Sequence, residues 1–223
     1  MLFGLGRWSS GASGYERGVE LEATGDLCGA EAAYRAAARA GGADAMVRLG
    51  VMLRARGERA GAEREYRRAD RRGSAEGAFN LGLLLAGRGD LAGAEAAYQR
   101  ADGRGMHSAA SNLGVLLAAR GDVDGAIAAY TRAERAGSAN GAANLGTLLM
   151  QRGDHAGAET AFRRARSLGD ARGEFGIGLT CEARGQLSRA ESHYRLASLA
   201  GVNDADAALA RLERLRGGHT TAE

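Results

Sequence analysis

The 223-residue sequence contains no proline and no lysine, and it has only two cysteines and one tryptophan. The absence of lysine, together with abundant alanine and glycine, is typical of a GC-rich coding sequence, so arginine supplies all 30 basic residues. Proline codons are also GC-rich, and the absence of proline needs another cause. Because proline removes a helix hydrogen bond and clashes with the preceding turn, its absence predicts a chain that is helical almost throughout.

Cysteine usage and charge exclude further classes of protein. Cys28 and Cys181 lie far apart and share no spacing with other metal ligands, so we expect reduced thiols in a cytoplasmic protein. No stretch approaches the roughly 20 apolar residues of a membrane span. Arg7 interrupts the apolar start MLFGLGRW, which lacks the order of a signal peptide. A formal charge of +3 is weak evidence for a nucleic-acid partner.

An internal repeat dominates the sequence. A glycine recurs every 32 residues, at Gly25, Gly57, Gly89, Gly121, Gly153 and Gly185. An aromatic residue follows each glycine by nine, at Tyr34, Tyr66, Tyr98, Tyr130, Phe162 and Tyr194. A Leu-Gly pair recurs with the same period before five of these glycines, at Leu49-Gly50, Leu81-Gly82, Leu113-Gly114 and Leu145-Gly146, and isoleucine replaces the leucine in Ile177-Gly178. Six such units without an insertion predict a repeat architecture.

Each unit contains two apolar stripes at helical spacing, one before and one after a Gly-Asp pair such as Gly89-Asp90. Gly89 suits the left-handed end of the first helix, and Asp90 can cap the N-terminus of the second. Asp26, Asp122 and Asp154 stand in the same place. Each unit is therefore predicted to form two antiparallel helices, which we call its first and second helix.

The spacing of the Leu-Gly pair, the alanines and the aromatic residue within a unit resembles the tetratricopeptide repeat. The resemblance is clearest in the stretch NLGLLLAGRGDLAGAEAAYQRA at 80–101. The linker, with Gly105, Ala109, Leu113 and Gly114, is more similar to Sel1-like repeats. The resemblance covers about residues 15–216. It implies an all-α fold, a right-handed α-solenoid of helix-turn-helix repeats, and a non-catalytic protein–protein interaction scaffold or adaptor. The spacing gives this solenoid six 32-residue repeats with terminal capping helices.

The two ends of the chain depart from the repeat. Tyr15 to Thr24 has Arg17 where leucine belongs, and Asp204 to Leu215 is apolar on one side only, as capping helices require. We expect a flexible N-terminal segment at 1–13, the solenoid at 14–216 and a disordered tail at 217–223. The segment MLFGLGRW is a candidate ligand for a second copy, which would give weak self-association.

No residue pattern indicates catalysis, a metal or a cofactor. The histidines His107, His155, His193 and His219 have no ligand spacing, and we interpret them as surface residues. The glycines follow no strand, which argues against a phosphate-binding loop. Cys181 occupies a core leucine position, while Cys28 can be exposed, and no base accompanies either thiol.

Arginines cluster on successive second helices, and such a ladder of charge can track nucleic-acid phosphates. They are Arg67, Arg68, Arg71, Arg72, Arg100, Arg104, Arg132, Arg135, Arg163, Arg164 and Arg166. Glutamates stand four residues before an arginine in four pairs, Glu31–Arg35, Glu63–Arg67, Glu159–Arg163 and Glu191–Arg195. This order of charges favours a solvated outer face, with a nucleic-acid-binding solenoid as the alternative.

In the family that the chain resembles, ligands lie along the first helices in an inner, concave groove. Carried over to this sequence, the binding positions are Val47, Val51, Phe79, Asn80, Leu83, Ser111, Asn112, Val115, Ala143, Asn144, Thr147, Met150, Phe175 and Leu179. The other units have Arg54, Ala86, Ala118 and Glu182 at the repeat position of Met150, and these are binding positions as well. This apolar lining favours an amphipathic helix or apolar peptide. The asparagines can grip a peptide backbone or brace neighbouring helices. A peptide-sensing regulatory module is a further alternative.

Overall fold

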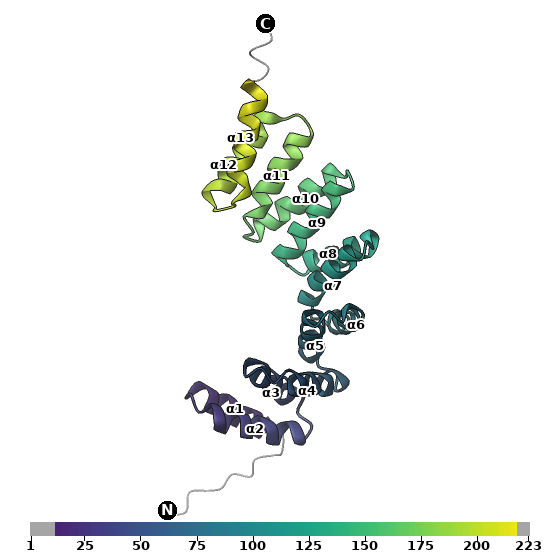
Figure 1. The fold of residues 1–223 in the computed structure, drawn as a ribbon, viewed down its shortest axis with the longest axis vertical. Coiled ribbons are helices and arrows are strands. Elements are labelled where there is room, and N and C mark those ends of the chain that lie inside the picture. The colour runs from purple at the N-terminus through teal and green to yellow at the C-terminus, as the bar shows by residue number, and fades with distance from the viewer. Residues whose placement is uncertain (1–11, 218–223) are drawn as a thin grey trace, which may run out of the picture. The chain divides into compact units, whose positions relative to one another are not determined.

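The computed structural model describes residues 12–217, and these form thirteen α-helices and no strand (Figure 1). The helices are α1 (Ala12–Ala23), α2 (Leu27–Arg39), α3 (Ala43–Ala55), α4 (Arg59–Arg71), α5 (Ala75–Gly87), α6 (Leu91–Gly103), α7 (Ser108–Ala119), α8 (Val123–Arg135), α9 (Ala139–Gln151), α10 (His155–Ser167), α11 (Arg172–Ala183), α12 (Leu187–Leu199) and α13 (Asp204–Gly217). The odd-numbered helices from α1 to α11 are the first helices of the six predicted repeats, and the even-numbered ones are the second helices.

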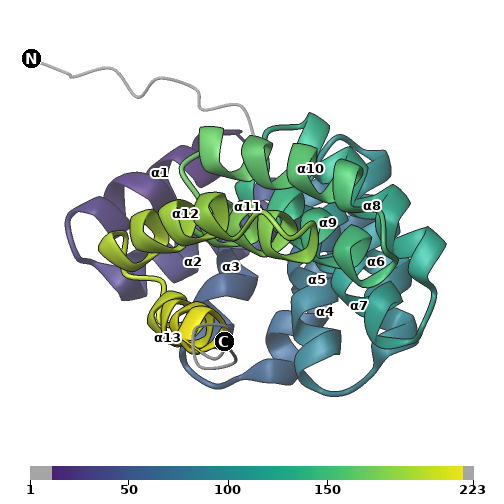
Figure 2. The ribbon, with the colours of Figure 1, turned by 90° about the horizontal axis from the view of Figure 1, so that it is seen from above.

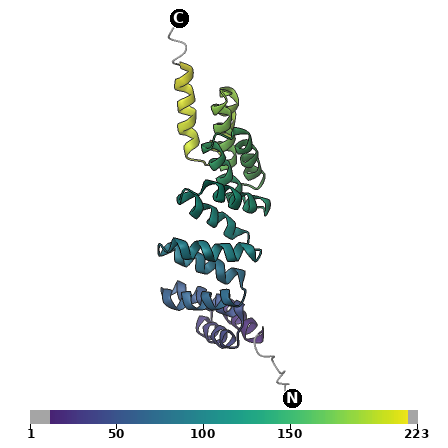
Figure 3. The same ribbon diagram turned by 90° about the vertical axis from the view of Figure 1, so that its right-hand side faces the viewer.

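The chain divides into two compact units, Met1–Ala109 and Ala110–Glu223. Unit 1 contains α1 to α6, in which each first helix packs on its second helix and successive pairs form layers, as Figure 3 shows for α3 to α6. Unit 2 contains most of α7 and continues to α13, and α9 lies beside α10 as α11 does beside α12 (Figure 2). This packing of consecutive helix pairs confirms the predicted all-α solenoid, while its right-handedness stays a prediction.

The turn within each pair has the predicted chemistry. Gly89 has a φ of 84°, which a side chain would strain, and the next amide, that of Asp90, donates to the Leu85 carbonyl at 3.0 Å. The Asp90 carboxylate then accepts a hydrogen bond from the Gly93 amide at 3.0 Å and caps α6. Asp26, Asp122 and Asp154 cap α2, α8 and α10 in the same way. Both predictions for this turn are confirmed.

An aromatic ring lies on the glycine of each Leu-Gly pair. A Cβ atom on Gly82 would stand 2.6 Å from ring atoms of Tyr98, and one on Gly114 would stand 2.5 Å from Tyr130. The glycine therefore lets the first helix approach the ring of the second helix directly. Each buried ring contributes roughly 1.5–3 kcal/mol by its apolar area. The spacing of Leu-Gly and aromatic residues thus determines how each helix pair closes.

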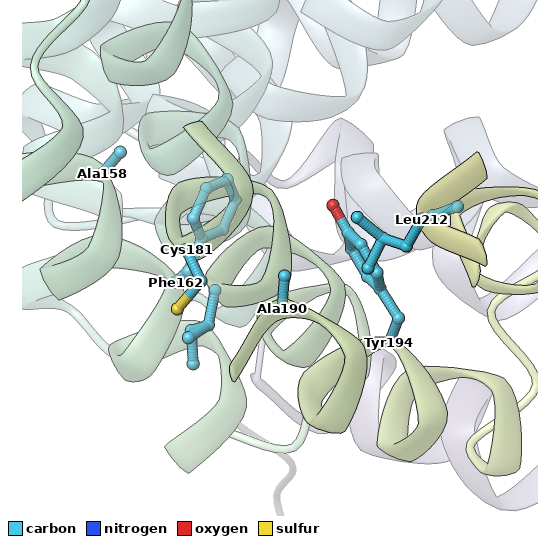
Figure 4. Close-up of a cluster of buried hydrophobic side chains, with 8 residues drawn as sticks. Ala158, Phe162, Cys181, Ala190, Tyr194 and Leu212 are labelled. Carbon is cyan, nitrogen blue, oxygen red and sulfur yellow. The ribbon is translucent and has the colours of Figure 1, made fainter. Parts of the chain in front are cut away.

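The last helix, α13, covers the apolar end of unit 2. Its Leu212 lies beside Tyr194 in a buried cluster that also contains Phe162 and Cys181 (Figure 4). Cys181 is therefore the predicted core thiol, and Cys28 is exposed. The predicted segments 1–13 and 217–223 lie mostly outside the described residues. Within the described part, residues 12, 13 and 217 are helical, so α1 and α13 extend slightly beyond the predicted solenoid.

Candidate functional site

The predicted binding residues lie on α3, α5, α7, α9 and α11, and they differ widely in exposure. Val115 and Thr147 are exposed, with 48% of the Val115 surface accessible. Nine are half-buried: Val51, Phe79, Leu83, Ser111, Asn112, Asn144, Met150, Phe175 and Leu179. These eleven present surface that a partner can contact.

The remaining three predicted positions are buried, and for these the expectation of a binding role needs correction. Val47 is 1% exposed and Ala143 is 2% exposed, because these small side chains end within the helix packing. Asn80 is 8% exposed, and its amide donates to the Glu76 carbonyl of its own helix at 3.1 Å. Val47 and Ala143 fill space between helices, and Asn80 is bound to the backbone of its own helix.

Phe79 and Phe175 stand at the same repeat position as Val47 and Ala143 but reach further out. The Phe79 ring lies 5.9 Å from that of Tyr98, centroid to centroid, in a tilted arrangement. Phe175 lies 5.4 Å from Tyr194 in the same manner. Each phenylalanine therefore covers the tyrosine of its own pair and keeps part of its surface open.

In unit 2, a hollow of about 200 Å³ lies between α7 and α9. It is lined by Val115, Ala118, Tyr130, Asn144, Thr147, Leu148 and Gln151. The Thr147 hydroxyl donates to the Ala143 carbonyl at 3.1 Å, so this side chain is held to its own helix. None of the lining residues is charged, and the hollow therefore combines an exposed apolar side chain with neutral amides.

The sequence analysis named Val115, Ala118, Asn144 and Thr147 as binding positions, and all four line this hollow, but it missed Tyr130, Leu148 and Gln151. Gln151 is the one polar residue at a repeat position that otherwise holds alanine or glycine, as in Ala119 and Gly87. That contrast is a signal in the sequence that points to Gln151. Tyr130 carries no such signal, because a tyrosine is the ordinary residue at its position.

In unit 1, a larger cleft of about 550 Å³ lies between the α3–α4 turn and α5. It is lined by Arg54, Ala55, Gly57, Arg59, Ala60, Glu63, Leu83, Leu84, Gly87 and Arg88. Leu83 and Arg54 are predicted binding residues, and the lining combines three arginines with small and apolar residues and one glutamate. The Glu63 carboxylate accepts from Arg88 at 2.9 Å and from Arg67 at 2.7 Å, so the acidic group of this cleft is already paired.

Glutamates on the second helices join neighbouring repeats. Glu159 pairs with Arg163 on its own helix and with Arg184 after the next first helix, at 2.6 Å in both cases. Glu31 and Glu63 have the equivalent double pairing with Arg35 and Arg56, and with Arg67 and Arg88. The four predicted pairs at four-residue spacing are confirmed, including Glu191–Arg195. The bonds to the following repeat could not be read from that spacing.

Several arginines of the proposed ladder also bond within the protein. Arg100 and Arg104 both donate to the buried Asp70 carboxylate, at 2.7 and 2.6 Å. Burial acts to raise the pKa of Asp70, but the two guanidinium groups hold it below the ordinary value of 3.8. The Arg68 guanidinium donates to the Ala38 carbonyl at the end of α2, at 2.8 Å. These arginines join helices, and their contacts do not favour a nucleic-acid interface.

Other reactive side chains are scattered. No group of three or more potential metal ligands occurs in the described part of the chain. His107 contacts Asp102 at 3.2 Å, and His193 is half-buried against Glu174 at 2.8 Å, so His193 is less exposed than predicted. His219 lies outside the described residues. Among residues 12–217, no helix is long and apolar enough to cross a membrane.

Comparison with known families and structures agrees with this architecture. A model of the tetratricopeptide repeat matches residues 79–141 and 144–203, and a second such model matches residues 43–69. No protein of curated function matches the sequence.

Three solved structures illustrate the structural likeness. The protective antigen c5321 of uropathogenic Escherichia coli, which displays an SLR fold, superposes with a TM-score of 0.77 at 22% identity, over 90% of this chain and 48% of its own. The chain thus spans about half of that protein. A Sel1 repeat protein from Oxalobacter formigenes superposes with a TM-score of 0.69 at 21% identity, over 88% of this chain and 86% of its own. YrrB, a TPR protein with an unusual peptide-binding site, superposes with a TM-score of 0.55 at 17% identity, over 69% of this chain and 83% of its own.

Proposed function

Because the chain belongs to the tetratricopeptide repeat family, whose fold generally serves as a protein–protein interaction scaffold, we propose that it holds a polypeptide partner along its first helices. In this role the chain binds and does not catalyse. The observation that carries the proposal is the hollow of unit 2, where exposed Val115 stands beside the neutral amides of Asn144 and Gln151.

The size of the hollow supports a peptide over a small molecule. Pockets for small ligands usually enclose about 300–1,000 Å³, whereas this hollow has about 200 Å³ and is open to solvent. It therefore suits one side chain of a longer segment that continues along the helices. YrrB, a TPR protein of similar fold with an unusual peptide-binding site, is consistent with such a ligand.

The lining also restricts the chemistry of that segment. Val115 offers apolar contact, and the Asn144 and Gln151 amides can each donate to a carbonyl and accept from an amide of a peptide backbone. No lining side chain can form an ion pair. The preferred segment at this hollow thus has an apolar side chain that enters it and a backbone accessible to amide groups, in an extended or frayed helical form.

The test is selection of peptides from a random display library on the full chain, followed by fluorescence anisotropy with individual peptides. Val115→Glu should weaken binding by about tenfold or more, since it introduces a charge into an apolar contact. Leu196→Glu is the matched control, because Leu196 on α12 is 50% exposed and lies outside the hollow. Failure to enrich any peptide, or equal losses in the two variants, would contradict the proposal.

A further inference from the structure

The first and the sixth helix pair each contain a buried tyrosine that donates to a glutamate of the same pair. The Tyr34 hydroxyl donates to Glu22 on α1 at 2.7 Å, and the Tyr194 hydroxyl donates to Glu182 on α11 at 2.5 Å. In both pairs the glutamate stands 12 residues before the tyrosine. The glutamate therefore fills the space in front of the phenol and satisfies its hydroxyl.

An arginine from the following helix braces each glutamate. Arg48 on α3 donates to the Glu22 carboxylate at 2.6 Å. Arg211 on α13, which takes the place of a first helix after the sixth pair, donates to the Glu182 carboxylate at 3.0 and 2.6 Å. The hydrogen bond from Arg48 is the main cause that lowers the pKa of Glu22. A neighbouring cation thus keeps this acid in its charged form.

The fourth pair, α7 and α8, keeps the tyrosine but has neither the glutamate nor the arginines. Ala118 stands 12 residues before Tyr130, in the place of the glutamate. Asn144 on α9 follows the first of the two arginines by three repeat lengths, and Thr147 precedes the second by two. All four of these side chains line the hollow of about 200 Å³. The hollow is therefore the space that the acid and its arginine occupy in the other two pairs.

The Tyr130 hydroxyl can be reached from this hollow. Tyr130 is 4% exposed and lines the hollow, and no described residue forms a hydrogen bond with its hydroxyl. Among residues 12–217, the one unpaired side-chain polar atom that is sealed from solvent is the Tyr66 hydroxyl. The Tyr130 hydroxyl is unpaired but not sealed, so it keeps contact with solvent. It is therefore a free donor and acceptor for a group that enters.

The neutral lining of the hollow favours an amide over a carboxylate. No charged side chain lines it, so a carboxylate that entered would give up water without gaining a cation. Glutamine has the size and shape of glutamate without the charge. Its carbonyl oxygen can accept from the Tyr130 hydroxyl, and its NH₂ group can donate to the amide oxygens of Asn144 and Gln151. Neither of these amides has a hydrogen-bond partner in the described part of the chain.

We propose that the hollow binds the carboxamide of a glutamine in the partner polypeptide. The glutamine carbonyl accepts from the Tyr130 hydroxyl, its NH₂ group donates to Asn144 or Gln151, and its methylene stem contacts Val115. This inference rests on the proposed function and specifies the side chain that enters. The stem supplies the apolar contact, and the polar tip uses a hydroxyl that a wholly apolar side chain would leave unpaired.

The first test uses a peptide display library on the full chain, with one central position limited to Gln, Glu, Met and Leu between random flanks. We expect glutamine to be enriched at that position. In a selected peptide measured by fluorescence anisotropy, replacing glutamine by glutamate should weaken binding by about tenfold, because the hollow contains no cation. Methionine, which has a similar length, should weaken binding by about two- to tenfold, because neutral hydrogen bonds are lost.

Tyr130→Phe tests whether the hydroxyl recognises the carboxamide. The variant keeps the ring that lies on Gly114, so the chain should remain folded by circular dichroism. The loss of affinity should be several-fold for the glutamine peptide and absent for the methionine peptide. A purely structural role of the hydroxyl would change the binding of both peptides equally.

Thr147→Arg should change the preference of the hollow from amide to acid. It places a guanidinium at the repeat position of Arg211, so the glutamate peptide should bind about tenfold more tightly than it binds the parent chain. The matched control is Thr160→Arg on α10, which should have no such effect. Thr160 is exposed, lies outside the hollow and, like Thr147, donates to the carbonyl four residues before it at 3.1 Å.

The outcomes separate this inference from the proposed function. It alone is overturned by a lack of glutamine enrichment, by equal effects of Tyr130→Phe on the glutamine and methionine peptides, or by equal effects of Thr147→Arg and Thr160→Arg. In those cases peptides still bind, and the hollow does not recognise a carboxamide. A library that yields no binding peptide overturns the inference together with the proposed function.

Discussion

The contact between Gly82 and the Tyr98 ring gives a direct test of how the helix pairs close. A Cβ atom at Gly82 would stand 2.6 Å from two ring carbons, and Tyr98 is buried and cannot turn away. Overpacking costs about 1–3 kcal/mol, while alanine in place of a helical glycine gains about 1 kcal/mol. We therefore expect Gly82→Ala to lower the free energy of unfolding by up to about 2 kcal/mol.

Gly87 provides the control within the same helix. It ends α5, and a Cβ atom there would meet nothing within 4 Å. Gly87→Ala should therefore leave stability unchanged or raise it by up to about 1 kcal/mol. The assay is urea unfolding followed by far-ultraviolet circular dichroism, with both variants measured against the parent chain. If Gly82→Ala is as stable as Gly87→Ala, the ring does not require glycine beneath it, and the account of pair closure is refuted.

Three further predictions concern polar contacts. Asp122→Ala removes the acceptor of the Gly125 amide and should cost about 1 kcal/mol in urea unfolding; no loss would mean that water caps α8 equally well. Tyr34→Phe should lower the free energy of unfolding by about 1 kcal/mol, because Glu22 loses the hydrogen bond from the Tyr34 hydroxyl. Tyr66→Phe should leave stability unchanged or raise it, because the Tyr66 hydroxyl has no hydrogen-bond partner among the described residues. Equal losses in the two variants would contradict this difference in hydrogen bonding. The pKa of Asp70 is lowered in the fold, so its ion pairs stabilise the chain above the ordinary value of 3.8 and are lost as pH falls through the folded pKa. Asp70→Asn should accordingly show a shallower loss of stability in acid titrations, and an unchanged titration would contradict this.

The fold could be predicted from the sequence because repeat proteins are built from contacts between near neighbours. Gly50 and Tyr66 lie sixteen residues apart, and the same spacing joins Gly82 to Tyr98, so one local rule closes each pair. The Gly-Asp turn is equally local, since a left-handed glycine and a capping carboxylate act within one turn of chain. No long-range pairing had to be inferred.

The candidate site was only partly predictable, because exposure depends on side-chain size at a fixed repeat position. Val47 and Ala143 end inside the packing, whereas Phe79 and Phe175 at the same position extend past it. Contacts between repeats depend on side-chain conformation as well. The bond from Arg100 to Asp70 joins residues 30 apart, and the spacing of charges within one helix does not reveal it.

The distribution of charge along the first helices limits where each kind of partner group can bind. Glu22 and Glu182 are already occupied by a tyrosine and an arginine of the chain, so neither offers a free charge to a partner. Arg54 in unit 1 has no such internal partner, and the hollow beside Val115 in unit 2 has no charged lining. Raising the salt concentration should therefore leave peptide binding at the hollow almost unchanged, because screening acts only on charges.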